Sequence, residues 1–324
     1  MSLASIIITT HDRPHLLARA VETARAAGTN IEIIVVDDAS TDETGKVCRT
    51  LAGIKHVRLE RNQRVAGARN VGLLVSSGEF VSFLDDDDLR LPHSLDEQVK
   101  LLEANKQAGL IYGQAILGDQ AGQPTNQVYP LVCPQGDAFW ELLGQNFIPC
   151  GSAVFRRSVL DRVGLLDGDL PGLDDWDLWI RIAELYPIIA FPKPVMIWRR
   201  STPVSGQGTS QAADIVSQGV RQFRHWWLKL PRATNAPAQM RRLAWRRFSA
   251  NMSAHLVWEA MRCLRLGYVS QATRNIFALA QLGPLVMVRL VRKRSISELL
   301  RKIVGHARRT SASYSDSIRR PSAS

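Results

Sequence analysis

Residues 80–92 read FVSFLDDDDLRLP, so four consecutive aspartates follow directly after a short apolar run. Adjacent carboxylates repel one another unless a cation lies among them. Mg²⁺ and Mn²⁺ prefer carboxylate oxygens, and Mg²⁺ commonly takes one or two protein carboxylates while substrate phosphates supply other ligands. The stretch therefore predicts either a metal–diphosphate site or, as in many runs of like charge, a solvated acidic turn.

Two further acidic turns lie upstream, and each follows a β-branched run. Residues 5–10 (SIIITT) precede Asp12, and residues 31–36 (IEIIVV) precede Asp37 and Asp38. Runs of this composition predict buried strands. The four-aspartate turn is thus the third acidic turn that comes after a predicted strand.

Helix-like segments follow the first two strands, at residues 15–27 and 41–52. Apolar strands that alternate with helices predict an α/β fold with a mostly parallel sheet flanked by helices. Ligands of such sheets bind outside the carboxyl ends of the strands. The three acidic turns are therefore expected to meet at one site.

Four ordered stretches resemble glycosyltransferase family 2, the inverting GT-A type: SIIITTHDRP, IEIIVVDDASTDET, RVAGARNVGLLVSSGEFVSFLDDDD and GLDDWDLWIRIAE. The resemblance covers about residues 2–210. It implies a Rossmann-like nucleotide-binding half joined to an acceptor-binding half, with a divalent metal, Mn²⁺ or Mg²⁺, held by a DxD motif. It also implies transfer of a sugar from a nucleotide-diphosphate donor to a hydroxyl, with inversion.

The resemblance assigns donor contacts residue by residue. The nucleotide-sugar-binding positions that it implies are Thr9, Asp12, Asp38, Arg69, Asn70, Asp85, Asp86, Arg200 and Ser205. Asp12 stands where the family usually has Asn. Arg69 and Asn70 belong to an element that opens a helix near the nucleotide, although Arg69 could instead decorate a helix surface. Arg199, Arg200 and Ser205 resemble a loop that closes over the diphosphate, and a plain surface loop is the alternative.

Aligning the acidic run with the family's pattern places the metal ligands at Asp85 and Asp87, with Asp87 as the direct ligand. Asp86 is then expected to face ribose or metal. Asp88 is expected to cap a helix that begins near Leu91, because aspartate is a favoured N-cap residue.

Residues 173–184 (LDDWDLWIRIAE) resemble the acidic pair that opens a helix and supplies the catalytic base. Asp175 matches the base, and Asp174 stands where Glu is more frequent. A base for this reaction must reach the acceptor hydroxyl. Read without the resemblance, the segment is an acidic first helical turn that interacts with the helix dipole.

Charge divides the chain into parts. Residues 1–211 carry 20 Lys and Arg against 26 Asp and Glu, whereas residues 212–324 carry 21 against 4. The expected organisation is a GT-A domain over residues 1–211, a basic helical extension over residues 212–309 and a disordered tail over residues 310–324. The halves of the GT-A domain are expected at about residues 1–108 and 109–211.

The basic extension interleaves Arg with aromatic residues, a composition that suits an anionic membrane surface. A membrane surface or a lipid-linked acceptor is therefore expected, a solvated helical appendage is the alternative, and nucleic acid is disfavoured as a partner. Among acceptors of the family, a cell-envelope polysaccharide or another glycan is also expected. The first predicted strand begins so early that no signal peptide is expected, and four cysteines without metal-ligand spacing indicate a reducing compartment. A cytoplasmic protein, peripheral at the inner face of the cell membrane, is the expected location.

Other function classes fit less well. No G-x-G-x-x-G follows the first predicted strand, as a nicotinamide dehydrogenase would require, and no P-loop is present. A metal phosphohydrolase and a non-catalytic nucleotide-sugar-binding or scaffolding protein of the same fold remain as alternatives. Among donors, a UDP-sugar is the first expectation, from family frequency alone.

Overall fold

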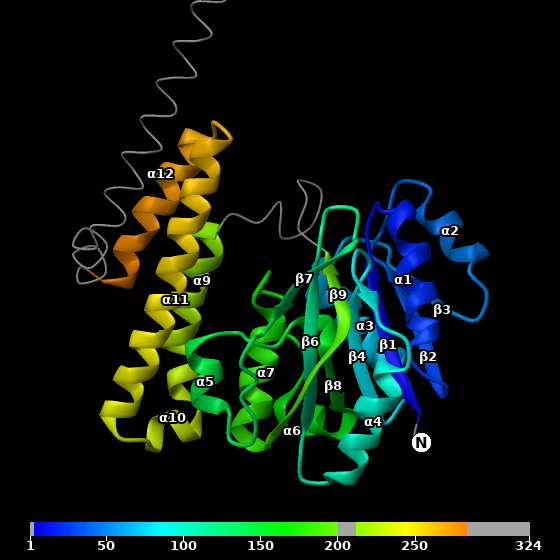
Figure 1. Ribbon diagram of the computed structural model, residues 1–324, viewed down its shortest axis with the longest axis horizontal. Coiled ribbons are helices and arrows are strands. Elements are labelled where there is room, and N and C mark those ends of the chain that lie inside the picture. The colour runs from blue at the N-terminus through cyan, green and yellow to red at the C-terminus, as the bar shows by residue number, and fades with distance from the viewer. Residues whose placement is uncertain (1–2, 200–211, 284–324) are drawn as a thin grey trace, which may run out of the picture. The chain divides into compact units, whose positions relative to one another are not determined.

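A computed structural model describes residues 3–199 and 212–283 (Figure 1). Within these residues a nine-stranded mixed sheet has the order β3-β2-β1-β4-β8-β6-β9-β5, and β7 pairs with β6 beside this path. Helices cover the sheet on both faces. The expected α/β fold with helices after the sheet is confirmed.

The N-terminal half of the sheet is parallel. Its strands are β1 (Ala4–Thr10), β2 (Ile31–Asp37), β3 (Lys55–Arg58) and β4 (Phe80–Asp85). Every residue of β1 is buried, as its unbroken apolar and β-branched composition predicts for a central strand. The two strands predicted from the β-branched runs, β1 and β2, are therefore present.

Helices connect these strands: α1 (Pro14–Ala26), α2 (Thr44–Thr50), α3 (Arg64–Val75) and α4 (Ser94–Ala104). Pro14 suits the first position of α1, where its missing N–H costs nothing. Gly72 lets α3 approach β1 closely, because a Cβ there would lie 2.3 Å from Cγ2 of Ile7. The close approach packs the C-terminal half of α3 against the middle of β1.

The second half of the sheet is mixed. Its strands are β5 (Leu89–Arg90), β6 (Leu110–Gly118), β7 (Pro124–Tyr129), β8 (Ala153–Arg156) and β9 (Ile188–Arg199). β8 runs antiparallel to both β4 and β6, and β9 is parallel to β6. The helices of this half are α5 (Phe139–Gly144), α6 (Leu160–Val163) and α7 (Asp174–Leu185), with single 3₁₀ turns at Cys150–Ser152 and Arg157–Val159.

The expected helix near Leu91 begins later, and Asp88 does not cap it. The N–H of Leu91 donates to the carbonyl of Val195 in β9 at 2.9 Å, so this residue bonds to the sheet and not within a helix. Pro92 follows, and a proline disfavours helical geometry in the residue before it. His93 is left-handed, with φ 58°, and α4 starts after it at Ser94.

The described C-terminal part is helical, as expected. It contains α9 (Ala212–His225), α10 (Pro231–Asn235), α11 (Ala238–Arg265) and α12 (Val269–Ala278), with 3₁₀ turns at Trp227–Lys229 and Leu279–Leu282. The contacts divide the chain into two compact units, and Arg221–Phe248 group with the α/β part, whereas Ala212–Val220 group with the residues from Ser249 onward. The tail expected over residues 310–324 lies outside the described residues.

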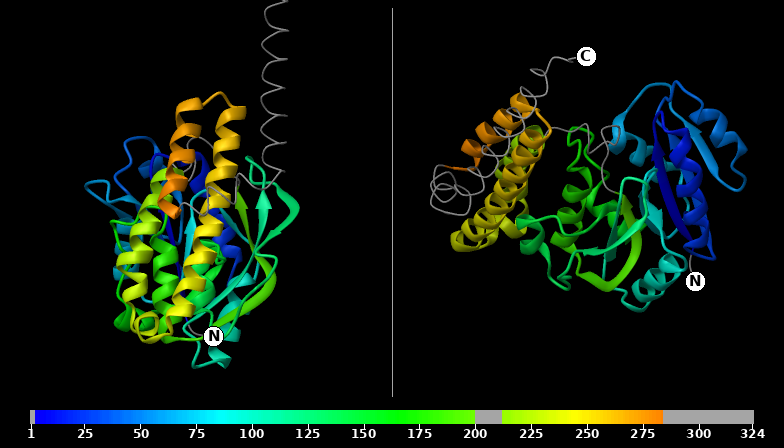
Figure 2. Two further views of the ribbon diagram at one scale, coloured as in Figure 1. Left: turned by 90° about the vertical axis from the view of Figure 1, so that its left-hand side faces the viewer. Right: turned by 45° about the horizontal axis from the view of Figure 1, so that its top comes forward.

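In the second unit α12 lies beside the C-terminal half of α11 in each view (Figures 1 and 2). Among the described helices, none combines the length and the hydropathy that crossing a bilayer requires.

Candidate active site

The four-aspartate run forms a tight turn at the end of β4. The N–H of Asp88 donates to the carbonyl of Asp85 at 3.0 Å, and this turn brings three of the four side chains together. One carboxylate oxygen from each of Asp85, Asp87 and Asp88 lies within 4.8 Å of the others. Asp88 is a candidate metal ligand that the sequence assigned to a helix cap.

The donor set suits a hard divalent cation, because every ligand atom is a carboxylate oxygen. Burial, followed by repulsion from Asp85, raises the pKa of both Asp87 and Asp88. A bound cation would relieve this repulsion. The chemistry of the turn thus fits Mg²⁺ or Mn²⁺.

Asp86 is not part of this group of three carboxylates. It accepts hydrogen bonds from Oγ1 of Thr10 at 2.7 Å and from Nη1 of Arg13 at 2.9 Å. Burial raises the pKa of Asp86 to about 6, although the adjacent guanidinium of Arg13 opposes the shift. Asp86 therefore connects the acidic turn after β4 to the end of β1.

The guanidinium groups of Arg13 and Arg199 lie beside the acidic turn. Nη2 of Arg199, the last residue of β9, donates to Asp87 at 3.2 Å, and the Arg199 N–H donates to Asp88 at 2.9 Å. Arg13 lies 3.9 Å from Asp87. Guanidinium groups bind phosphate oxygens through paired N–H donors. Arg13 is not among the predicted donor contacts, and its signal in the sequence is its place in the HDRP turn after β1.

The ends of β1, β2 and β4 are level, so their acidic turns share one edge of the sheet. Thr9 pairs in register with Asp85, and Thr10 pairs with Asp37. The expected convergence of the three turns is therefore present in the structure. Asp12 and Asp38 nevertheless lie outside the group of three carboxylates that could hold a metal.

Asp12 and Asp38 hold loops at this edge. Asp12, with φ 50°, accepts a hydrogen bond from the N–H of Thr41 at 2.6 Å, which is the main cause of its lowered pKa. Asp38 accepts from the N–H of Gln63 at 2.7 Å, and burial raises its pKa. The nucleotide contacts assigned to Thr9, Asp12 and Asp38 stay predictions.

Arg69 is buried and is not a surface decoration of its helix. Its Nη2 donates to Asp85 at 2.6 Å, its Nη1 donates to Asp174 at 2.8 Å, and its guanidinium lies 5.3 Å from the ring centre of Phe83. A single side chain thereby connects the acidic turn after β4 with the first turn of α7.

Asn70, the neighbour of Arg69, pairs with the loop that leads to α7. Its Nδ2 donates to the carbonyl of Leu166 at 2.8 Å, and its Oδ1 accepts from the Leu166 N–H at 2.9 Å. The amide thus holds this loop in place. A nucleotide contact of Asn70 remains a prediction. Arg200 and Ser205, the last two predicted donor contacts, lie outside the described residues.

Asp175 lies in the first turn of α7, next to Asp174. It is half-buried, and Oδ1 accepts a hydrogen bond from the N–H of Trp176 at 2.6 Å. Burial and the adjacent charge of Asp174 raise the pKa of Asp175 to about 7. A carboxyl group with a pKa near neutrality suits proton abstraction.

Curated relatives carry the same kind of domain. An uncharacterised glycosyltransferase of Rickettsia conorii is 30% identical over 206 residues, 61% of this chain and 34% of its own length. The Escherichia coli UDP-Glc:alpha-D-GlcNAc-diphosphoundecaprenol beta-1,3-glucosyltransferase WfaP is 27% identical over 187 residues, 56% of this chain and 70% of its own length. The chain thus spans about a third of the length of the Rickettsia relative.

Solved structures share the fold. TarS residues 1–349 of Staphylococcus aureus, in complex with UDP-GlcNAc, superpose with a TM-score of 0.64 at 16% identity, covering 87% of this chain and 80% of that one. The mannosyltransferase PcManGT of Pyrobaculum calidifontis, in complex with GDP-Man and Mn²⁺, gives a TM-score of 0.54 at 20% identity, covering 86% and 85%.

Residues 5–164 match the family model of glycosyl transferase family 2. This segment begins in β1 and contains the acidic turn, Arg69 and Asn70. With this match, the sequence relatives and the GT-A-like fold, the chain belongs to glycosyltransferase family 2.

Proposed function

We propose that this protein is an inverting glycosyltransferase that moves a sugar from a nucleotide-diphosphate sugar to a hydroxyl acceptor. One observation carries the proposal: buried Arg69 forms ion pairs with both Asp85 and Asp174. These pairs join a turn that suits a divalent metal to the helix turn that bears a carboxyl group with a pKa of about 7. The two chemical requirements of the reaction thus occur in one connected site.

The donor side is the acidic turn with its arginines. Asp85 and Asp87 would hold Mn²⁺ or Mg²⁺, and Asp88 adds a third carboxylate within reach. Bound there, the metal supplies positive charge that favours departure of the nucleoside diphosphate. Arg199 is placed to bind diphosphate oxygens once its partner Asp87 binds the cation. Arg13 pairs with Asp86 and lies 3.9 Å from Asp87, so it adds a second positive charge beside the same turn.

Asp175 acts on the acceptor side as the general base. It accepts the proton of the acceptor hydroxyl as that oxygen forms a bond with the anomeric carbon. The bond from this carbon to the diphosphate oxygen breaks on the opposite face, so the configuration inverts. The nucleoside diphosphate leaves with the bonding electrons, and the proton stays on Asp175 until water removes it.

The proposed donor and acceptor classes are supported by what similar proteins bind or transfer. TarS binds UDP-GlcNAc and PcManGT binds GDP-Man with Mn²⁺, while WfaP transfers glucose from UDP-Glc to a diphosphoundecaprenol-linked sugar. We take a UDP-sugar as the first donor to test, and a lipid-linked or cell-envelope glycan as the acceptor.

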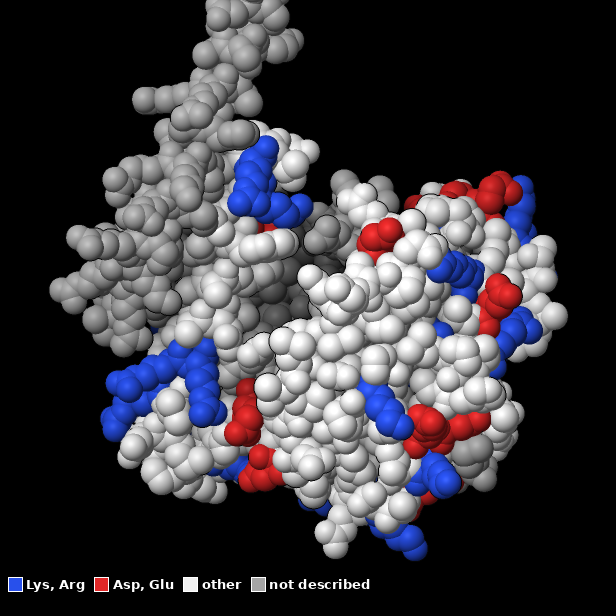
Figure 3. All heavy atoms as spheres, in the orientation of Figure 1, with Lys and Arg blue, Asp and Glu red and all other residues white. Residues whose placement is uncertain are grey.

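A peripheral position at the inner face of the cell membrane is part of the proposal. It is supported by the excess of Lys and Arg in residues 212–324, and Figure 3 shows such side chains over α11. The exposed large apolar residues of α12 also support it: Val269, Ile276 and Phe277 are 62%, 44% and 74% exposed. Basic helices with an apolar face suit an anionic lipid surface.

A thermal-shift screen of nucleoside diphosphates and nucleotide sugars, with and without Mn²⁺, tests the donor site, because a ligand of the folded state raises apparent stability. Release of nucleoside diphosphate from the stabilising nucleotide sugar then tests catalysis. Stabilisation without release would favour a scaffold of the same fold. Release of inorganic phosphate instead would indicate a phosphohydrolase.

A further inference from the structure

Asp177 is a buried carboxylate in the first turn of α7, two residues after Asp175. Its Oδ1 accepts hydrogen bonds from Nε2 of Gln222 at 2.9 Å and from Nε1 of Trp227 at 2.8 Å. Its Oδ2 accepts from Nε of Arg181 at 2.8 Å. A buried carboxylate needs such donors, and removing one leaves the charge undersatisfied.

Two of these donors, Gln222 and Trp227, belong to the segment Arg221–Phe248, which the contacts group with the α/β part of the chain. Gln222 lies near the end of α9, and Trp227 begins the 3₁₀ turn that follows. Both lie beyond residues 5–164, where the family model matches. The helix α7 also lies beyond that match, and it is bound by residues from the end of α9 and the turn after it.

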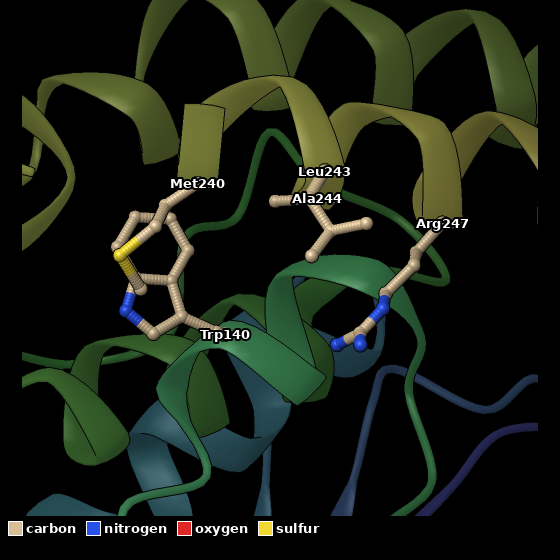
Figure 4. Close-up of a pocket in the computed structure, with 5 residues that line it drawn as sticks. All are labelled: Trp140, Met240, Leu243, Ala244 and Arg247. Atoms are coloured by element: carbon tan, nitrogen blue, oxygen red, sulfur yellow. The ribbon is translucent and has the colours of Figure 1, made fainter. Parts of the chain in front are cut away.

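Aromatic packing reinforces these hydrogen bonds. The fully buried ring of Trp227 lies 5.1 Å from that of Trp176, the residue between Asp175 and Asp177. Nε1 of Trp176 donates to the carbonyl of Leu142 in α5 at 2.7 Å. Trp140 of α5 and Met240 of α11 line one small pocket (Figure 4). The first turn of α7 thus packs between α5 and the helical segment.

We infer that Asp177, bound by Gln222 and Trp227, is a positioning residue that sets the orientation of the Asp175 carboxyl group. This inference rests on the proposed role of Asp175 as the base. Arg69 anchors Asp174 from the N-terminal half of the chain, and Gln222 and Trp227 anchor Asp177 from the C-terminal half. The base lies between the two anchors, so its position depends on both.

Loss of the second anchor should affect the rate more than donor binding. The donor site is built from the turns after β1, β2 and β4, which Asp177 does not contact, whereas Asp175 shares its helical turn. A displacement of about 1 Å at a reacting group can cost about a hundredfold in rate. A residue that only stabilises the fold would not separate the two effects in this way.

The test compares Trp227→Phe and Gln222→Leu in the full chain. Each substitution removes one hydrogen-bond donor to Asp177 and puts an apolar side chain in the place of the donor. Trp226→Phe is the matched control, because it also replaces an indole with a phenyl ring. Trp226 is the residue before Trp227 and is 66% exposed. The measurements are amide hydrogen exchange of residues 174–180 and turnover of UDP-glucose with Mn²⁺.

Both variants should increase exchange in residues 174–180 and leave exchange in β1 and β4 as in the parent. Their kcat should fall by about tenfold to a hundredfold while KM for UDP-glucose stays within about twofold. Trp226→Phe should match the parent in every measurement. Combining Trp227→Phe with Asp177→Leu should lower kcat no further than Asp177→Leu alone, because Asp177→Leu already removes the acceptor of the Trp227 hydrogen bond.

Unchanged exchange and unchanged kcat in both variants would overturn the inference, as would a rise in KM that equals the loss in kcat/KM. Exchange that increases throughout the α/β part would assign these residues to general stability instead. If the parent chain turns over no nucleotide sugar, the proposed function fails, whereas the exchange measurement still decides whether Gln222 and Trp227 order the first turn of α7.

Discussion

Arg69 and Asp174 form a buried ion pair of 2.8 Å between residues that lie 105 positions apart in the chain. The same guanidinium pairs with Asp85 at the edge of the acidic turn. In the proposed reaction the two carboxylates serve different substrates, because Asp85 belongs to the donor side and Asp174 adjoins the acceptor base. Arg69 therefore sets the spacing between the donor and acceptor sides.

Replacing Arg69 should destabilise the protein. Arg69→Met leaves two carboxylates without their cation, and removing one partner of a buried ion pair typically costs about 3 kcal/mol or more. Urea denaturation monitored by tryptophan fluorescence measures the loss. Arg61→Met is the control, because Arg61 is exposed, and it should change the free energy of unfolding little. Equal stabilities of the two variants would mean that the pairs with Asp85 and Asp174 contribute nothing.

Asp87→Asn should abolish the Mn²⁺-dependent part of the nucleotide thermal shift and preserve the fold. An amide is a weaker ligand than a carboxylate for a hard cation, and Asp87 lies in a surface-lining turn. Asp161→Asn, at an exposed position of α6, should keep the full shift. A full Mn²⁺-dependent shift in Asp87→Asn would move the metal to other carboxylates of the run.

Asp175→Asn should keep donor affinity and lose turnover by about a hundredfold to ten-thousandfold, the usual contribution of a general base. The reason is that Asp175 acts on the acceptor proton and not on the nucleotide. Binding is measured by the nucleotide thermal shift and turnover by release of nucleoside diphosphate. A variant that loses nucleotide affinity would instead place Asp175 in the donor site.

Turnover should fall on the acid side of about pH 7. The base works only when it is deprotonated, and burial with the charge of Asp174 raises the pKa of Asp175 to about 7. Below that pH, turnover should fall about tenfold per unit. The residual activity of Asp175→Asn should lack this dependence. A parent profile that stays flat down to about pH 5 would show that Asp175 titrates near its ordinary value.

The same shift has the opposite sign for stability. The folded state holds the Asp175 proton more tightly than the unfolded chain does, so this group stabilises the fold below its ordinary pKa of 3.8. That contribution is lost as the pH rises from 3.8 to about 7. Comparing the urea midpoints of the parent and Asp175→Asn across this range isolates the contribution, because asparagine does not titrate.

The full chain should sediment with anionic liposomes and bind neutral ones less well. Exposed charges are screened over about 8 Å at physiological ionic strength, so added salt should weaken binding. Phe277→Ser should also weaken it, because Phe277 is a 74% exposed ring on α12. Leu74→Ser, at a 73% exposed position of α3, is the control for loss of an exposed apolar side chain. Binding that ignores lipid charge would leave the C-terminal helices as a surface for a protein partner.

Local patterns were enough to predict β1, β2 and β4, because unbroken β-branched and apolar runs indicate buried parallel strands wherever they occur. They also predicted that the acidic turns meet, since parallel strands end at the same edge of a sheet. The family resemblance added the candidate ligands Asp85 and Asp87 and the candidate base Asp175. These predictions depend on short segments and on one general rule of sheet topology.

Only the tertiary structure decided how the aspartates divide their contacts. Within the run, Asp86 turns to Thr10 and Arg13, while Asp88 joins Asp85 and Asp87, because the chain folds back through a turn whose geometry four identical residues do not reveal. Likewise, residues 174–179 (DDWDLW) place three aspartates in one helical turn, and the local sequence does not distinguish their roles. Arg69 binds Asp174, and Gln222 and Trp227 bind Asp177. These partners come from distant parts of the chain, and no local periodicity encodes which buried carboxylate a distant donor reaches.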